Sequence, residues 1–228
     1  MAGRSKSQLE LRLPTWGGKR RGAGRKPKNG KAGVAHVARP PLASRYPVHV
    51  SLKLLPELGN LRDANRYLRI REALSAGCDK PDFRVCHHSV QSNHIHLIVE
   101  AHSAQSLSRG IQGLTVRIAR CLNRLLGRKG RVFADRFFSR ILRTPREIRN
   151  CIAYVLNNRS RHREGKNSET HELAFDPCSN AASFDGWRTK PRSVRRFSGH
   201  PGVTEAKTWL LSVGWRRLGL LVPAYVPQ

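Results

Sequence analysis

The stretch that decides the fold is Ser92-Asn93-His94-Ile95-His96-Leu97-Ile98-Val99-Glu100. Successive side chains of a β-strand point to opposite faces, so a strand here places His94 and His96 on one face and turns the alternating aliphatic residues into a core. Residues 83–90 form a second strand candidate, and the short polar turn at 91–93 separates the two. The stretch therefore predicts a β-hairpin that carries two neighbouring imidazoles.

The segments around this hairpin complete a mixed α and β pattern. Residues 48–52 alternate between apolar and polar side chains, as a half-buried strand does. The apolar spacing of residues 56–77 and 103–126 predicts two helices, with Ser103 as the N-cap of the second. Residues 132–142 are again strand-like and strongly basic.

A third helix has the clearest start in the sequence. Thr144-Pro145-Arg146-Glu147 supplies an N-cap threonine, a proline at the first helical position and a glutamate three residues after the cap, which together form a capping box. The helix is expected to run to about Asn158. The resulting order of elements predicts an α+β, ferredoxin-like sandwich with an antiparallel sheet and the helices on one face. This domain would span residues 46–159, followed at 160–228 by a linker and a small Trp-containing appendage.

The composition points to a polyanionic partner. Lys and Arg number 43 against 15 Asp and Glu, a formal net charge of +28. A net charge of about 2–8 already keeps a small domain soluble. The much larger charge found here destabilises a compact state through self-repulsion, so nucleic acid is the expected partner.

Part of this charge lies in an N-terminal arm. Residues 1–45 hold twelve Lys and Arg and a single acid, Glu10. The arm mixes glycine with cations and lacks apolar periodicity, so it is expected to be disordered, with its cations available to lie along phosphates. The alternative is a solvated tail with no specific role. The residues expected to bind DNA are Lys19, Arg20, Arg21, Arg25 and Lys26 in the arm and Arg136 and Arg140 in the basic strand.

Several classes of protein are disfavoured. The mean hydropathy is −0.52, and the longest apolar stretch, 218–222, is far shorter than the ~20 residues of a membrane span. No apolar segment follows the charged N-terminus, so no secretory signal is visible. Five cysteines without a CxxC pair fit reduced thiols in a cytoplasm. The absence of GxxxxGK[ST], GxSxG and HExxH motifs argues against nucleotide-hydrolysing, α/β-hydrolase and zincin chemistry.

The third helix brings a second candidate group. Tyr154 and Asn158 are i,i+4 neighbours at the edge of its apolar stripe, so phenol and amide project side by side. Together with the hairpin histidines they suggest a phenolic nucleophile beside a divalent-metal site. The structural alternatives are a half-buried amphipathic tyrosine and two surface histidines on a basic sheet. A zinc site that adds Cys86 and His88 is a further alternative, although its spacing does not match the usual structural zinc patterns.

Three segments, in this order, resemble the single-tyrosine HUH transposases, and within them the REP-associated tyrosine transposases and related insertion-sequence enzymes. Residues 92–100 are similar to the HUH motif, in which a hydrophobic residue separates two histidines. Residues 131–137 resemble the strand that follows, and Tyr154-Val155-Leu156-Asn157-Asn158 resembles the catalytic-tyrosine helix. The resemblance covers residues 47–158, roughly half of the chain.

The resemblance implies a homodimeric transposase that cleaves single-stranded DNA near hairpins and transfers the strand. By the same resemblance, His94 and His96 bind Mg²⁺ or Mn²⁺, Asn158 is the third ligand, and Tyr154 attacks a DNA phosphate to leave a 5′-phosphotyrosine and a free 3′-hydroxyl. A free phenol, with a pKa of about 10, is only about 0.1% ionised at pH 7, so it needs the help of a metal and basic surroundings.

Two other functions stay open from the sequence. One is a domesticated DNA- or RNA-binding protein that keeps the fold but has lost cleavage. The other is a structural zinc protein, which would lose its fold with a chelator. The transposase and the domesticated binding protein both predict that the affinity for DNA falls steeply as the salt concentration rises.

Overall fold

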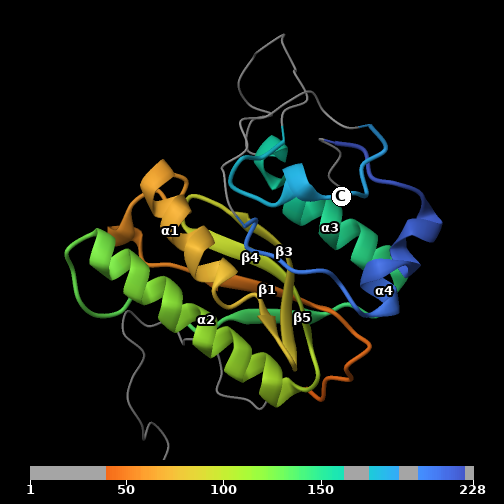
Figure 1. The fold of residues 1–228 in the computed structure, drawn as a ribbon, viewed down its shortest axis with the longest axis horizontal. Coiled ribbons are helices and arrows are strands. Elements are labelled where there is room, and N and C mark those ends of the chain that lie inside the picture. Colours follow the sequence, from red (N-terminus) through yellow and green to blue (C-terminus); the bar gives the residue numbers. More distant parts are fainter. Residues whose placement is uncertain (1–39, 162–174, 190–199, 224–228) are drawn as a thin grey trace, which may run out of the picture. The chain divides into compact units, whose positions relative to one another are not determined.

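The strands form one five-stranded sheet. The computed structural model describes residues 40–161, 175–189 and 200–223, all within one compact unit. Neighbouring strands are antiparallel and lie in the order β2-β3-β4-β1-β5 (Figure 1). The strands are β1 (Val48–Lys53), β2 (Asp79–Lys80), β3 (Phe83–Val90), β4 (His94–Ala101) and β5 (Phe138–Ile141). β3 and β4 form the predicted hairpin, and the α+β ferredoxin-like class is confirmed.

Helices cover both faces of this sheet. α1 (Ala64–Ser75) and α2 (Ala104–Leu125) lie side by side on one face and bury the first core with the apolar residues of β1 and β4 (Figure 1). α3 (Pro145–Arg161) packs on the opposite face, which corrects the expectation that all helices share one side. The physical reason is Ile98, which makes the second face of β4 apolar as well and gives the stripe of α3 a surface to cover.

The predicted helix starts are confirmed at α2 and α3. Ser103 Oγ accepts a hydrogen bond from the backbone N–H of Ser106 at the start of α2. At α3, Thr144 Oγ1 accepts from the N–H of Glu147, while the Glu147 carboxylate accepts from the N–H groups of Arg143 and Thr144. These bonds satisfy backbone donors that have no partner inside the helix.

Two element boundaries differ from the sequence expectation. The helix expected from Pro56 is a single 3-10 turn (Pro56–Leu58) that ends at Gly59 with φ of 68°, and α1 begins only after the side chain of Asp63 caps it. The strand expected over 132–142 shrinks to β5. Before β5, residues 132–134 form only an isolated bridge, Phe133 with Leu54, and the Arg131 guanidinium donates to the carbonyls of Phe133 and Ala134.

The C-terminal segments complete a second core with α3. They carry the 3-10 turns Ala181–Ser183 and Gly214–Leu218 and the short α4 (Trp209–Ser212). Trp187 and Trp215 are buried in this core, so the predicted appendage packs on the sheet. Among the described residues, no helix is long and apolar enough to cross a membrane. All five cysteines are free thiols.

Buried carboxylates attach these segments to the rest of the domain. Glu100, only 2% exposed at the end of β4, accepts from the guanidinium of Arg84, from the N–H groups of Lys207 and Thr208, and from the Thr208 hydroxyl. Asp176 receives two hydrogen bonds from Arg62, at 2.6 and 3.0 Å. Charge-assisted bonds of this kind compensate the desolvation of the buried carboxylates.

Substitutions at two glycines of α2, Gly110 and Gly113, can test how this helix packs on the sheet. A Cβ at Gly110 would lie 2.2 Å from Cγ of the buried Phe83, whereas a Cβ at Gly113 would meet no atom within 4 Å. We expect Gly110→Ala to lower the free energy of unfolding by about 1–3 kcal/mol through overpacking. Gly113→Ala should raise it by about 0.5–1 kcal/mol through helix propensity. Urea unfolding measures both, and equal shifts for the two variants would contradict this packing.

Candidate active site

The candidate site lies on the face of the sheet that α3 covers. Along β4, His94 and His96 share this face with Ile98, while the intervening residues enter the first core. The two imidazole rings meet edge to face, with their centroids 4.6 Å apart. His94 Nδ1 lies 2.8 Å from the Asn93 side-chain oxygen. In the neutral ring, Nδ1–H donates to this oxygen, and the lone pair is then on Nε2.

Tyr154 comes to this pair from α3. Its hydroxyl oxygen lies 3.4 Å from His96 Nε2, although the two residues are 58 positions apart in the sequence. The phenol ring stands edge to face against the His96 ring, at a centroid distance of 5.2 Å. Tyr154 is half-buried, while the stripe residues beside it are fully buried. The fold therefore joins the tyrosine and one of the two histidines in direct contact.

A third histidine, His49 of β1, completes the cluster and was not among the residues singled out from the sequence. His49 Nε2 lies 3.2 Å from His96 Nδ1, and the two rings are stacked. His49 appeared in the sequence only as a polar member of an alternating strand. Its period of two indicates the correct face, but the pairing of β1 with β4 is a long-range contact that spacing does not reveal.

The imidazoles of His49 and His96 are held neutral. Burial lowers the pKa of His96 to about 3, with a further contribution from the neighbouring His49 and His94. Burial also lowers the pKa of His49 to about 4, and the positive charge of Arg140 adds to this effect. A neutral imidazole keeps a lone pair on one ring nitrogen, which is the form that binds metal ions.

Asn158 lies one helical turn after Tyr154 and is buried. Its amide nitrogen Nδ2 has no hydrogen-bond partner among the described residues. An unpaired N–H donor of this kind serves an acceptor such as water or a phosphate oxygen, whereas the atom of the carboxamide that could bind a cation is Oδ1. The described residues contain no cluster of three or more His, Cys, Asp and Glu side chains arranged for a metal ion, so a site here depends on this amide or on water as a further ligand.

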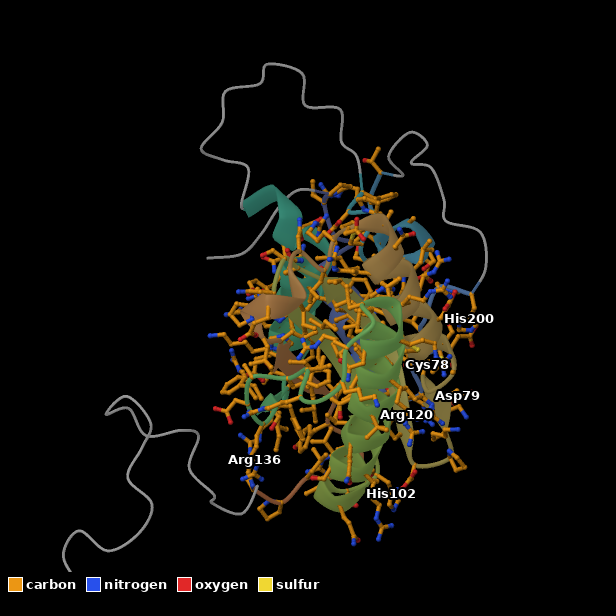
Figure 2. The ribbon with its side chains drawn as sticks, turned by 90° about the vertical axis from the view of Figure 1, so that its left-hand side faces the viewer. Cys78, Asp79, His102, Arg120, Arg136 and His200 are labelled. Atoms are coloured by element: carbon orange, nitrogen blue, oxygen red, sulfur yellow. The ribbon has the colours of Figure 1, made fainter. Side chains whose placement is uncertain are left out.

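The expected DNA-binding cations divide into two groups. Arg136 and Arg140 are both exposed, and Arg140 forms an ion pair with Glu147 at 3.1 Å. Figure 2 shows Arg136 on one side of the molecule and Asp79 on the other, as expected because β5 and β2 are the two edges of the sheet. Lys19, Arg20, Arg21, Arg25 and Lys26 lie outside the described residues.

The alternative hairpin zinc site does not form. A β-bulge between Val85 and His87 shifts the register of β3. As a result Cys86 packs with the second core, whereas His88 stacks against Tyr67 of α1 on the other face. The two candidate ligands therefore point to opposite sides of the sheet.

Comparisons with known proteins agree with this fold. Residues 60–158 match the family model described as IS200-like transposase, a segment that includes His94, His96, Tyr154 and Asn158. The solved structures that resemble this chain include a REP-associated tyrosine transposase bound to a REP hairpin. The TM-score is 0.53 at 15% identity, over 76% of this chain and 99% of that one. A search among curated protein sequences gives no match.

The fold is thus similar to that of a REP-associated tyrosine transposase. The match of residues 60–158 to the IS200-like transposase model confirms the resemblance seen in the sequence. His49 precedes this segment, so neither the motif nor the family match points to it.

Two further histidines, His87 and His88, make stability depend on pH. Burial lowers the pKa of His87 to about 4 and that of His88 to about 3, from an ordinary value of 6.5. Below pH 6.5 the unfolded chain therefore binds protons that the folded protein does not. Their stabilising contribution is complete above pH 6.5 and is lost as the pH falls toward 4, at about 1.4 kcal/mol per pH unit for each histidine.

We expect His87→Gln to reduce the slope of unfolding free energy against pH between about pH 6.5 and 5. The exposed His102 provides the control, because His102→Gln should leave the slope unchanged. Urea unfolding at several pH values within this window measures the slope, and equal slopes in wild type and His87→Gln would contradict the assignment.

Proposed function

We propose that this protein is a transposase that cleaves single-stranded DNA and transfers the strand, with Tyr154 as its nucleophile. The observation that carries the proposal is the 3.4 Å contact of the Tyr154 hydroxyl with His96. The family match supports a transposase, and the structural relative was solved with a DNA hairpin. The homodimer implied by the sequence resemblance stays a prediction.

His94, His96 and Asn158 are the residues that would hold a divalent metal, Mg²⁺ or Mn²⁺. Two neutral imidazoles and a carboxamide oxygen are a suitable donor set, completed by water and phosphate oxygens. All three protein groups are uncharged, so they do not neutralise a bound cation. Such a cation, when bound, would withdraw charge from the scissile phosphate and stabilise the transition state.

The chain's own residues would divide the remaining work. Tyr154 Oη forms a bond to phosphorus while the bond from phosphorus to the 3′-oxygen breaks. The phenol proton passes to solvent, and the departing 3′-oxygen takes up a proton to become a hydroxyl. The 5′-phosphate stays on the tyrosine as a phosphodiester, and attack by a 3′-hydroxyl on this ester reverses the reaction and joins the strand.

His49 would position His96 for this reaction. His96 Nδ1 lies 3.2 Å from His49 Nε2, so a neutral His96 with its proton on Nδ1 would donate that proton to His49 and keep its other nitrogen available to a metal ion. Hydrogen bonds from a ligand's second nitrogen fix the tautomer and orientation of the ring. His49 is thus a positioning residue that acts through His96.

Covalent capture tests the nucleophile. The full chain is incubated with single-stranded oligonucleotides from the DNA that flanks its own gene, in the presence of Mg²⁺ or Mn²⁺, and run on a denaturing gel. We expect a metal-dependent protein–DNA adduct that disappears in Tyr154→Phe and in His94→Ala. Tyr67→Phe is the matched control because Tyr67 lies in α1 on the opposite face of the sheet.

The same assay separates the alternative function. An adduct that survives Tyr154→Phe would mean that another residue is the nucleophile. Salt-sensitive DNA binding without any adduct would favour the domesticated DNA-binding protein, for which the fold and the arginines suffice.

The positioning role of His49 predicts a graded effect on metal binding. We expect His49→Leu to weaken Mn²⁺ binding about 10- to 100-fold, the usual effect of losing a group that orients a ligand. His49→Gln should retain most of the affinity, since its side-chain amide can accept from His96. Mn²⁺ titration calorimetry on the full chain measures both, with the exposed His102→Leu as the control. Wild-type affinity in His49→Leu would contradict this role.

A further inference from the structure

Phe138 of the edge strand β5 is an exposed aromatic side chain. It is the most exposed of the large apolar side chains in the described residues, at 65%. Its neighbour Phe137 packs against the first core. Side chains alternate along β5, so Phe138 lies on the other face, the face that carries the candidate site.

The strand register aligns Phe138 with that site. Phe138 pairs with Ser51 of β1, and Ser51 pairs with His96 of β4. Directly paired residues of antiparallel strands place their side chains on the same face. Adjacent strands lie about 4.8 Å apart, so the backbone of Phe138 is about 10 Å from that of His96. The next row of the same face pairs Arg140 with His49.

Exposed cations surround this aromatic ring. Arg136 and Arg140 lie two residues to either side of Phe138, and Lys53 is exposed at the end of β1. The nearby acids are Glu147, which pairs with Arg140, and Asp135, which accepts from the backbone N–H of Arg136. An exposed aromatic ring among cations is the arrangement by which proteins hold single-stranded nucleic acid: the cations follow the backbone and the ring stacks on a base.

We propose that Phe138 is a base-stacking platform that holds a nucleotide of the single-stranded substrate close to the phosphate presented to Tyr154. The inference rests on the proposed function and adds a DNA-contacting residue outside the tyrosine–histidine cluster. A second copy of the chain is a poorer occupant of this surface, because a two-fold contact here would bring the exposed Arg136 and Arg140 against the same cations of the other copy. A polyanion with exposed bases satisfies both the ring and the arginines.

The test compares full-length variants in binding to a single-stranded oligonucleotide from the flanking DNA of the gene. We expect Phe138→Ala to weaken binding about 5- to 150-fold, the range that corresponds to one stacked base. The dependence of affinity on salt should stay unchanged, because no phosphate contact is lost. Phe138→Trp should restore the affinity. Trp209→Ala removes another exposed aromatic ring, 50% exposed on the C-terminal segment, and should have no effect.

A 2-aminopurine probe gives a direct signature of stacking. Placed in turn at each position of the oligonucleotide, it should be quenched at one position by the wild type and by Phe138→Trp, and remain bright with Phe138→Ala. Unchanged affinity and unchanged fluorescence in Phe138→Ala would overturn the platform. Conversion of a wild-type dimer into a monomer by Phe138→Ala, seen by sedimentation, would also overturn it, since the ring would then belong to an interface between copies.

Covalent capture keeps this result separate from the proposed function. We expect Phe138→Ala to form the adduct at saturating DNA, since Tyr154 and the histidines are intact. An adduct in the wild type together with unaltered binding by Phe138→Ala rejects the platform alone. No wild-type adduct, together with loss of stacking in Phe138→Ala, rejects the cleavage chemistry and leaves the platform standing as a DNA contact.

Discussion

The alternation of side chains along β4 is the constraint on which the rest of the structure depends. One set of residues, Ile95, Leu97 and Val99, enters the core beneath α1 and α2, while the other set carries the histidines, Ile98 and Glu100 on the opposite face. A shift of one residue in register would reverse both sets. The histidines would then enter an apolar core, and Glu100 would lose the backbone donors of the C-terminal segment, so the same pairing that folds the sheet also assembles the site.

The second face explains why the tyrosine reaches the histidines. The apolar stripe of α3 is buried against Ile98 of β4 and against Trp187 and Trp215 of the C-terminal segments. Tyr154 is at the margin of this stripe, where the packed core ends and the polar row of β4 begins. Its position is therefore a consequence of core packing, which brings its hydroxyl to His96.

Much of this arrangement was predictable because its signals are local. The hairpin turn at residues 91–93, the cap at Ser103 and the capping box at Thr144 each depend on a few consecutive residues, and the structure has them as expected. The delayed start of α1 depends on the positive φ of Gly59, which composition alone does not specify. His49 and the bulge in β3 were missed because they depend on which distant strands pair and in which register.

The electrostatics of the site support the proposed strand cleavage over simple binding. Phosphates are bound well by exposed cations such as Arg136 and Arg140, which need no desolvation. His96 is instead buried beside His49, at a pKa of about 3, so folding forgoes the protonated form that would attract DNA. A module that only bound nucleic acid would gain nothing from uncharged imidazoles held against a tyrosine hydroxyl. Neutral imidazoles can bind a metal ion, and the adjacent phenol can attack a phosphate that this ion polarises. The proposed strand cleavage requires both groups side by side.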